Sequence, residues 1–347
     1  MSRKKWEERA EREIRAERKG PVVSNAAALL EMSFAPVQWG VRGILPEGVT
    51  ILSGDPKIGK SWLLYQAVIA VATGTPLWPG REPEQAGDAF YLALEDNDRR
   101  LQRRLQKLLP YFSRVERGGQ IKPPNVSRLH YVTEWPRAEE GIEQLADWLR
   151  AHPECRLVVI DTLSKFRNLE PGRKSAYAHD YEAGQLFRSL AKEFSCAIVL
   201  VMHNRKQESA DALQLVSGTQ GMTGSVDNVI VLKRERGKMD AGLYVDGRDI
   251  EEPQEIALKF GDGYWSGDGR TVDEARMSDQ RHRLMRVVAD LGVEARSRAI
   301  CEAMSGNKPG TIRTLLSKMV KDGHLDLTDG LYTLSGTAVT AVTKEAA

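Results

Sequence analysis

The 347-residue sequence has few cysteines, no long apolar run and almost no net charge. Its three cysteines, Cys155, Cys196 and Cys301, stand far apart, which excludes a disulfide framework or a closely spaced metal knuckle. The longest apolar runs, such as CAIVLVM, are too short to cross a bilayer, and the first twenty residues lack the apolar segment of a secretory signal. We therefore expect a cytoplasmic protein without a membrane span. Because the net charge is only +2, any binding of nucleic acid has to come from local basic loops.

Residues 49 to 232 alternate short apolar runs with longer helical patterns. The runs VTILSG, AFYLAL, RLVVID, AIVLVM and NVIVLK are apolar almost throughout, which predicts an α/β fold with a mostly parallel sheet covered on both faces. The stretch that follows reads as antiparallel strands with turns at Asp246-Gly247 and Asp262-Gly263. We expect these strands to complete one edge of the sheet.

The C-terminal part changes to a helical pattern. Three helical segments precede a hairpin around Asp329-Gly330, and this order predicts a small winged helix-turn-helix domain. Its third helix would be the recognition helix and carries Lys308, Arg313, Lys318 and Lys321. The charged N-terminal segment has Glu–Arg pairs at helical spacing and is either a solvated end or an arm that packs on a neighbouring subunit. We divide the chain into an arm (1–20), a core (21–268), a linker (269–276), the winged-helix domain (277–336) and a tail (337–347).

The segment GDPKIGKSW fits the phosphate-binding pattern G-x-x-x-x-G-K-[ST]. It follows one apolar strand and opens a helix, so successive backbone N–H groups can surround a phosphate. We expect Lys60 to reach the β and γ phosphates of ATP and the Ser61 hydroxyl to ligate Mg²⁺. The expected nucleotide-binding residues are Gly54, Asp55, Pro56, Lys57, Ile58, Gly59, Lys60, Ser61 and Trp62.

Four further strands end in residues that carry chemistry. Asp161 follows RLVVI and fits the acid of the Mg²⁺ shell, because the carboxyl ends of parallel strands converge on the ligand. His203 follows AIVLVM and fits a γ-phosphate sensor on the same rim. Glu95 and Asp96 stand side by side after FYLAL. The local residues leave open whether this acidic pair binds metal, takes a proton from water or only caps the next helix, with Asp96, Asn97 or Asp98 as the cap. The last strand ends in Lys233, Arg234 and Arg236, which form either an exposed edge or part of a neighbour's active site.

The order of these motifs over residues 36–265 resembles the RecA-like P-loop ATPases. The phrases GDPKIGKSWL, LALED, VIDTL, GTQGMTGSVDNVIVLKRERG and VDGRDIEE are most similar to the hexameric replicative DNA helicases of the RepA helicase family, a plasmid and phage type. The resemblance implies that Glu95 polarises the attacking water, that Asp161 is the Walker B acid and that His203 is a switch residue. It also implies an arginine that acts on the adjacent subunit's ATP. Counting from Asp227 reaches Arg234, with Arg236 as the second candidate.

Two basic segments follow Asp161 and His203 and match the family's DNA-facing loops. Backbone phosphates of a single strand could be contacted there by Arg167, Arg173, Lys174, Arg205 and Lys206. The leading hypothesis is a Mg²⁺-dependent ATPase that forms a hexameric ring and moves along single-stranded DNA, with replication proteins or duplex DNA as partners of the winged helix. The alternative is an ATP-switched replication-initiation or recombination factor that binds DNA without unwinding it. A small-molecule kinase is the weaker third class.

With the P-loop and Asp161 assigned to phosphate and metal, Glu95 is left with the attacking water. Asp96 and Asn97 then best fit the cap of the helix DRRLQRRLQKLL.

Overall fold

The computed structural model describes residues 24–115, 120–166, 176–203, 224–234, 240–267, 269–304 and 306–335. The chain divides into a short unit up to Val37 and a large unit from Gln38 onward. The short unit contains helix α2 (Ala26–Leu30), whose N-cap Asn25 accepts a hydrogen bond from the Ala28 N–H at 2.9 Å. The predicted arm 1–20 and tail 337–347 lie outside the described residues.

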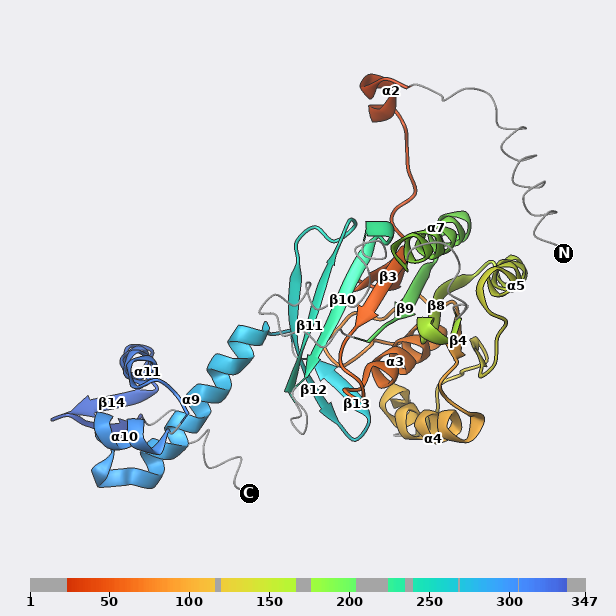
Figure 1. Cartoon of the computed structure of the whole chain (residues 1–347). Helices are drawn as coiled ribbons and strands as arrows, with labels where there is room; N and C mark the ends of the chain where they lie inside the picture. The colour runs from red at the N-terminus through yellow and green to blue at the C-terminus, as the bar shows by residue number, and fades with distance from the viewer. Residues whose placement is uncertain are drawn as a thin grey trace. The chain divides into compact units, whose positions relative to one another are not determined.

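The large unit is built on a nine-stranded sheet (Figure 1). Six neighbouring strands run parallel, in the spatial order β10-β3-β9-β8-β4-β7. Their bounds are β3 (Gly48–Ser53), β4 (Asp88–Ala93), β7 (Leu129–Val132), β8 (Cys155–Asp161), β9 (Ala197–Val201) and β10 (Asn228–Arg234). The predicted α/β class with a mostly parallel sheet is confirmed, and every continuous apolar run is a strand of this sheet.

Three antiparallel strands complete the edge beside β10, as predicted: β11 (Asp240–Gly247), β12 (Gln254–Gly261) and β13 (Tyr264–Gly267). The turn between β12 and β13 is Asp262-Gly263, and both residues have the positive φ of a type I′ turn. The turn expected at Asp246-Gly247 was wrong, since both residues are paired within β11. Gly247 is needed there because a Cβ would collide with the side chain of Asn228.

Helices cover both faces of the sheet, and alternate residues of each strand face opposite sides. One apolar cluster joins Leu52 and Tyr91 to helix α3 (Lys60–Thr73) and helix α4 (Asp98–Leu108). The other joins Ile51 and Phe90 to α5 (Ala138–Ala151), α6 (Leu163–Phe166) and α7 (Ala176–Phe194). Shorter elements are η1 (Leu109–Phe112) and the strand pairs β1 (Trp39–Val41) with β2 (Leu45–Pro46) and β5 (Arg114–Val115) with β6 (Ile121–Lys122).

The C-terminal elements occur in the predicted order of three helices and a hairpin. They are α9 (Val272–Leu291), η3 (Gly292–Glu294), α10 (Ser297–Ala303), α11 (Pro309–Lys321), β14 (Leu325–Thr328) and β15 (Leu331–Leu334). They share a separate apolar cluster that includes Leu284, Ile300, Leu316 and Leu325. Helix α9 begins at Val272, so most of the predicted linker 269–276 is helical. The sequence of its first turns lacks the apolar periodicity that would predict a helix. None of the helices described is long and apolar enough to span a membrane.

Candidate active site

The P-loop connects the end of β3 to the start of α3 and depends on two glycines. A Cβ on Gly54 would come within 2.7 Å of the Leu232 carbonyl oxygen, which lies on the neighbouring strand β10. Gly59 has φ 107° and is the N-cap of α3, and a Cβ on it would lie 2.9 Å from the ring of Trp265. The Trp265 indole N–H donates to the Gly59 carbonyl at 3.0 Å. The loop therefore takes a shape that only glycine permits, and β13 supports it from outside.

Lys60 is folded back against its own loop. Its Nζ donates to the carbonyls of Gly54 at 2.6 Å and Asp55 at 2.9 Å, and lies 3.3 Å from His203 Nδ1. Burial lowers the pKa of Lys60 to about 8, against the opposing pull of Asp161, Asp55 and Glu95. The predicted phosphate ligand and the predicted sensor thus meet at the end of the sheet where β3 and β9 finish.

Asp161 is buried at the end of β8, and its carboxylate faces two hydroxyl groups. The Tyr91 hydroxyl donates to Oδ2 at 2.7 Å, and the Ser61 side chain also hydrogen-bonds to the carboxylate. Burial raises the pKa of Asp161, while the hydrogen bonds from Ser61 and Tyr91 act to lower it. Burial also raises the pKa of Tyr91 well above its usual range, so the phenol stays protonated and remains a donor.

The adjacent Ser61 and Asp161 suit Mg²⁺, which takes hard oxygen ligands and keeps most of its positions for water and phosphate. Within the described ranges there is no group of three or more His, Cys, Asp or Glu side chains that could hold a metal ion. A cation held by Ser61 and Asp161 would have positions left for oxygen atoms of the nucleotide and of solvent.

Glu95 and Asp96 have separate surroundings although they are neighbours in the sequence. Glu95 is exposed just beyond β4, and its Oε1 accepts a hydrogen bond from the Thr162 hydroxyl at 3.0 Å. The Asp96 side chain is only 8% exposed and pairs with Arg100 and Arg104 on helix α4. Asn97 is the N-cap of α4 and accepts from the Arg100 N–H at 3.0 Å. Of the three cap candidates, Asn97 is the N-cap of α4. Asp96 contacts the same helix through its ion pairs with Arg100 and Arg104.

Arg234 lies beside the P-loop of its own chain. Its Nη1 donates to the Ile58 carbonyl at 3.2 Å, and its guanidinium lies 4.4 Å from the centre of the Phe260 ring. Lys233 points to the other face of β10, where its Nζ lies 5.4 Å from the centre of the Tyr244 ring. Arg234 and Lys233 therefore face opposite sides of the sheet, and of the two only Arg234 contacts the P-loop.

Six predicted catalytic and DNA-binding residues lie outside the described residues. They are Arg167, Arg173 and Lys174 after β8, Arg205 and Lys206 after β9, and Arg236 after β10. Their roles stay predictions.

Three side chains of this region were not predicted as site residues from the sequence. Tyr91 looks like any apolar residue of a buried strand, and Thr162 carries no signal beyond its place after Asp161. Gln66 on α3 is fully buried and binds the backbone of β13 and of residue 77 through both ends of its amide. Only its polar character within an otherwise apolar helix pattern could have marked it.

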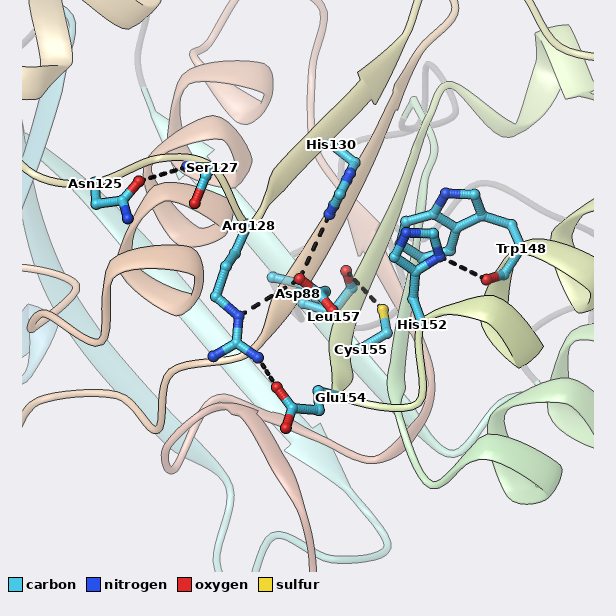
Figure 2. A network of polar contacts seen from close by, with 10 residues as sticks. All are labelled: Asp88, Asn125, Ser127, Arg128, His130, Trp148, His152, Glu154, Cys155 and Leu157. Atoms are coloured by element: carbon cyan, nitrogen blue, oxygen red, sulfur yellow. Dashed lines mark hydrogen bonds and ion pairs between the residues drawn. The ribbon is translucent and has the colours of Figure 1, made fainter.

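A second polar cluster lies at the opposite ends of the parallel strands (Figure 2). Asp88 at the start of β4 contacts Arg128 at 3.5 Å and His130 at 3.4 Å, and Arg128 also pairs with Glu154. His152 Nδ1 lies 2.8 Å from the Trp148 carbonyl oxygen. Because β4, β7 and β8 are parallel, this cluster is separated from Glu95 and Asp161 by the length of the strands. It joins their first residues and takes no part in the P-loop site.

Comparison with known proteins agrees with this architecture. The profile of the AAA domain family matches residues 13–209. Among solved structures, a DnaB-like replicative helicase studied with its primase superposes with a TM-score of 0.50 at 11% identity, covering 75% of this chain and 70% of that one. The ATPase domain of G40P gives 0.47 at 10% identity, covering 63% and 84%, and the RadB recombinase gives 0.44 at 14% identity, covering 64% and 91%. No curated protein matches the sequence.

The family match spans more than half of the chain and includes the P-loop, Glu95, Asp161 and His203. The likeness to the DnaB-like helicase concerns the fold alone. The chain therefore belongs to the AAA domain family, and its core has the fold of the DnaB-like replicative helicase.

Proposed function

We propose that this protein is a Mg²⁺-dependent ATP hydrolase that acts on DNA, and that it works as a ring-forming, hexameric replicative helicase moving along single-stranded DNA. One observation carries the hydrolytic part of the proposal. The P-loop after β3, Glu95 after β4 and Asp161 after β8 meet at one rim of the sheet: Ser61 hydrogen-bonds to Asp161, and Thr162, the residue after Asp161, donates to Glu95. A complete set of phosphate, metal and water ligands is expected of an enzyme that hydrolyses ATP and not of one that only binds it.

Each side chain has a distinct proposed role. Lys60 binds the β and γ phosphates, and the loop amides and the start of α3 bind the remaining phosphate oxygens. Ser61 and Asp161 hold Mg²⁺, which when bound neutralises charge on the phosphates. Glu95 orients the attacking water and accepts its proton. His203 responds to a change at the γ phosphate and passes it to the segment that follows, a role supported by its distance of 3.3 Å from Lys60 Nζ.

Arg234 is the proposed arginine that acts on the ATP of the adjacent subunit, with Arg236 second. In comparable enzymes an arginine supplied by a neighbour accelerates hydrolysis by about 10³- to 10⁵-fold. Hydrolysis should therefore depend on assembly of the ring.

DNA contact is assigned to the segments after Asp161 and His203, through Arg167, Arg173, Lys174, Arg205 and Lys206. Binding through phosphates would be insensitive to base sequence and would weaken as salt is raised. The small C-terminal module is proposed to be a winged helix that recognises duplex DNA or a replication protein. A primase is a reasonable partner to test, since the DnaB-like helicase was studied with one.

The central experiment measures ATP turnover of the wild-type protein with and without single-stranded DNA, together with its mass in solution. We expect an oligomer whose turnover rises with DNA. Lys60→Ala is the matched control and should abolish both nucleotide binding and turnover. A wild-type monomer that hydrolyses ATP at full rate and ignores DNA would contradict the proposal.

A second candidate is an ATP-switched DNA-binding factor for replication initiation or recombination that does not unwind DNA. It is favoured by the C-terminal module, which has its own apolar cluster and presents Arg313, Lys318 and Lys321 as exposed side chains on α11. Displacement of a labelled strand from a forked duplex separates the two candidates. Unwinding supports the helicase, whereas DNA-stimulated turnover without displacement supports the binding factor.

A further inference from the structure

Thr162 is a buried residue that follows Asp161 directly and turns its hydroxyl toward Glu95. It is 2% exposed, and its Oγ1 lies 3.0 Å from Glu95 Oε1 and 2.7 Å from Ser164 Oγ. The hydroxyl is not needed to form the turn into α6, because the Lys165 N–H is satisfied by the backbone carbonyl of Thr162 at 3.0 Å. A threonine at a helix start commonly uses its hydroxyl to bind a backbone N–H of the first turn. The Thr162 hydroxyl is directed toward Glu95 instead, which indicates another role.

The chemistry of the three groups fixes the direction of the hydrogen bonds. A carboxylate can only accept, so Thr162 donates its single hydroxyl hydrogen to Glu95. The hydroxyl oxygen is then free to accept, and Ser164 is the donor. Ser164, Thr162 and Glu95 therefore form a directed chain in which each bond polarises the next.

Glu95 needs such support because it is exposed and has a long, flexible side chain. Fixing a glutamate side chain costs up to about 2 kcal/mol in rotamer entropy. A group that orients a water molecule has to be held within about 0.5 Å of its working position. Within the described ranges, the bond from Thr162 is the one hydrogen bond identified for the Glu95 carboxylate. It holds Oε1 and leaves Oε2 available to a water molecule.

We propose that Thr162 is a positioning residue for the hydrolysis of ATP, an inference that rests on the proposed function. Thr162 anchors Oε1 of Glu95, and Oε2 accepts the proton of the attacking water. The water oxygen forms a bond to the γ phosphorus as the bond to the leaving phosphate oxygen breaks. Thr162 keeps its own proton throughout and does not touch the reacting atoms.

The test replaces Thr162 with residues that distinguish the effect of its hydroxyl group from the effect of its side-chain volume. Thr162→Val keeps the shape and removes the hydroxyl, whereas Thr162→Ser keeps the hydroxyl and removes the methyl group. We expect Thr162→Val to lower kcat by about 10- to 100-fold, the scale of a small misplacement of a catalytic group. KM and the affinity for a fluorescent ATP analogue should stay within about twofold, since the phosphate ligands are untouched. Thr162→Ser should restore most of the turnover.

The same substitution in a Glu95→Gln background provides the specific control. If Thr162 acts through Glu95, Thr162→Val should cause no further loss once the carboxylate is gone. An equal loss in both backgrounds overturns the inference, as does normal turnover of Thr162→Val or a loss in Thr162→Ser as deep as in Thr162→Val. Should Thr162→Val not fold, Thr162→Ala compared with Thr162→Ser makes the same distinction.

Failure of the inference can be told from failure of the proposed function. A wild-type protein that does not hydrolyse ATP, or a Glu95→Gln variant with normal turnover, overturns the assignment of Glu95 and the inference with it. Normal turnover of Thr162→Val beside an inactive Glu95→Gln overturns the inference alone.

Discussion

The two adjacent carboxylates after β4 should have different roles. Loss of the Glu95 charge should lower kcat and spare stability, whereas loss of the Asp96 charge should lower stability and spare kcat. Glu95→Gln keeps the size of the side chain and still accepts a hydrogen bond from Thr162, but it removes the base. We expect kcat to fall at least about 100-fold, as when a general base is lost. Because Glu95 is exposed, the free energy of unfolding should change by no more than about 0.5 kcal/mol. Nucleotide binding and assembly should persist.

Asp96→Asn is the matched control. Asp96 is 8% exposed and Arg104 is 16% exposed, so their contact is shielded from water, whereas Arg100 is 44% exposed and contributes little. Hydrogen bonds to charged groups contribute about 1.5–3 kcal/mol, so we expect this substitution to lower the free energy of unfolding by about 2 kcal/mol. The Glu95 carboxylate and its bond to Thr162 are left in place, so kcat should remain within about threefold of the wild type.

Two measurements on each variant decide the matter. Phosphate release at saturating ATP and Mg²⁺ gives kcat, and unfolding in urea gives stability. The reasoning is refuted if Glu95→Gln turns over at a near-normal rate, in which case the role passes to Asp96 or Asp161. It is equally refuted if Asp96→Asn loses as much kcat as Glu95→Gln while keeping its stability.

Two further predictions concern the support of the P-loop and the ring. Gln66→Leu leaves three buried backbone groups without partners, two of them from Trp265. Each loss costs about 1 kcal/mol or more, so the free energy of unfolding in urea titrations should fall by at least about 3 kcal/mol. The control is Gln144→Leu at an exposed position, and a change for Gln66→Leu as small as the control's, below about 1 kcal/mol, would contradict the prediction. Mixing Arg234→Ala with Lys60→Ala subunits, each inactive alone, should restore part of the turnover, because some interfaces then combine an intact P-loop with an intact arginine. No recovery in mixed oligomers would mean that Arg234 acts within its own chain.

Much of the framework could be predicted because its signals are local. Continuous apolar runs identify buried parallel strands, and the P-loop pattern places phosphates at the end of β3 wherever the rest of the chain lies. Once the sheet is known to be parallel, the residues after its strands must share one rim. This is why Lys60, Asp161, Glu95 and His203 could be grouped before their contacts were known.

The rest depends on distances that sequence patterns do not encode. Thr162 reaches Glu95 across 67 positions, and Tyr91 reaches Asp161 across 70. The two Asp-Gly pairs of the antiparallel edge look alike in the sequence. One forms a turn because its φ angles are positive, whereas the other contains Gly247 because Asn228 leaves no room for a side chain.

The support of Gly59 by Trp265 has a consequence for the order in which the protein matures during synthesis. The two residues are 206 positions apart, so the P-loop motif leaves the ribosome long before the strand that holds it in shape. Nucleotide cannot stabilise the nascent chain through a finished P-loop until β13 has emerged. Fragments that end before that strand should behave as partly folded proteins, although they contain every motif by which an ATPase is usually recognised.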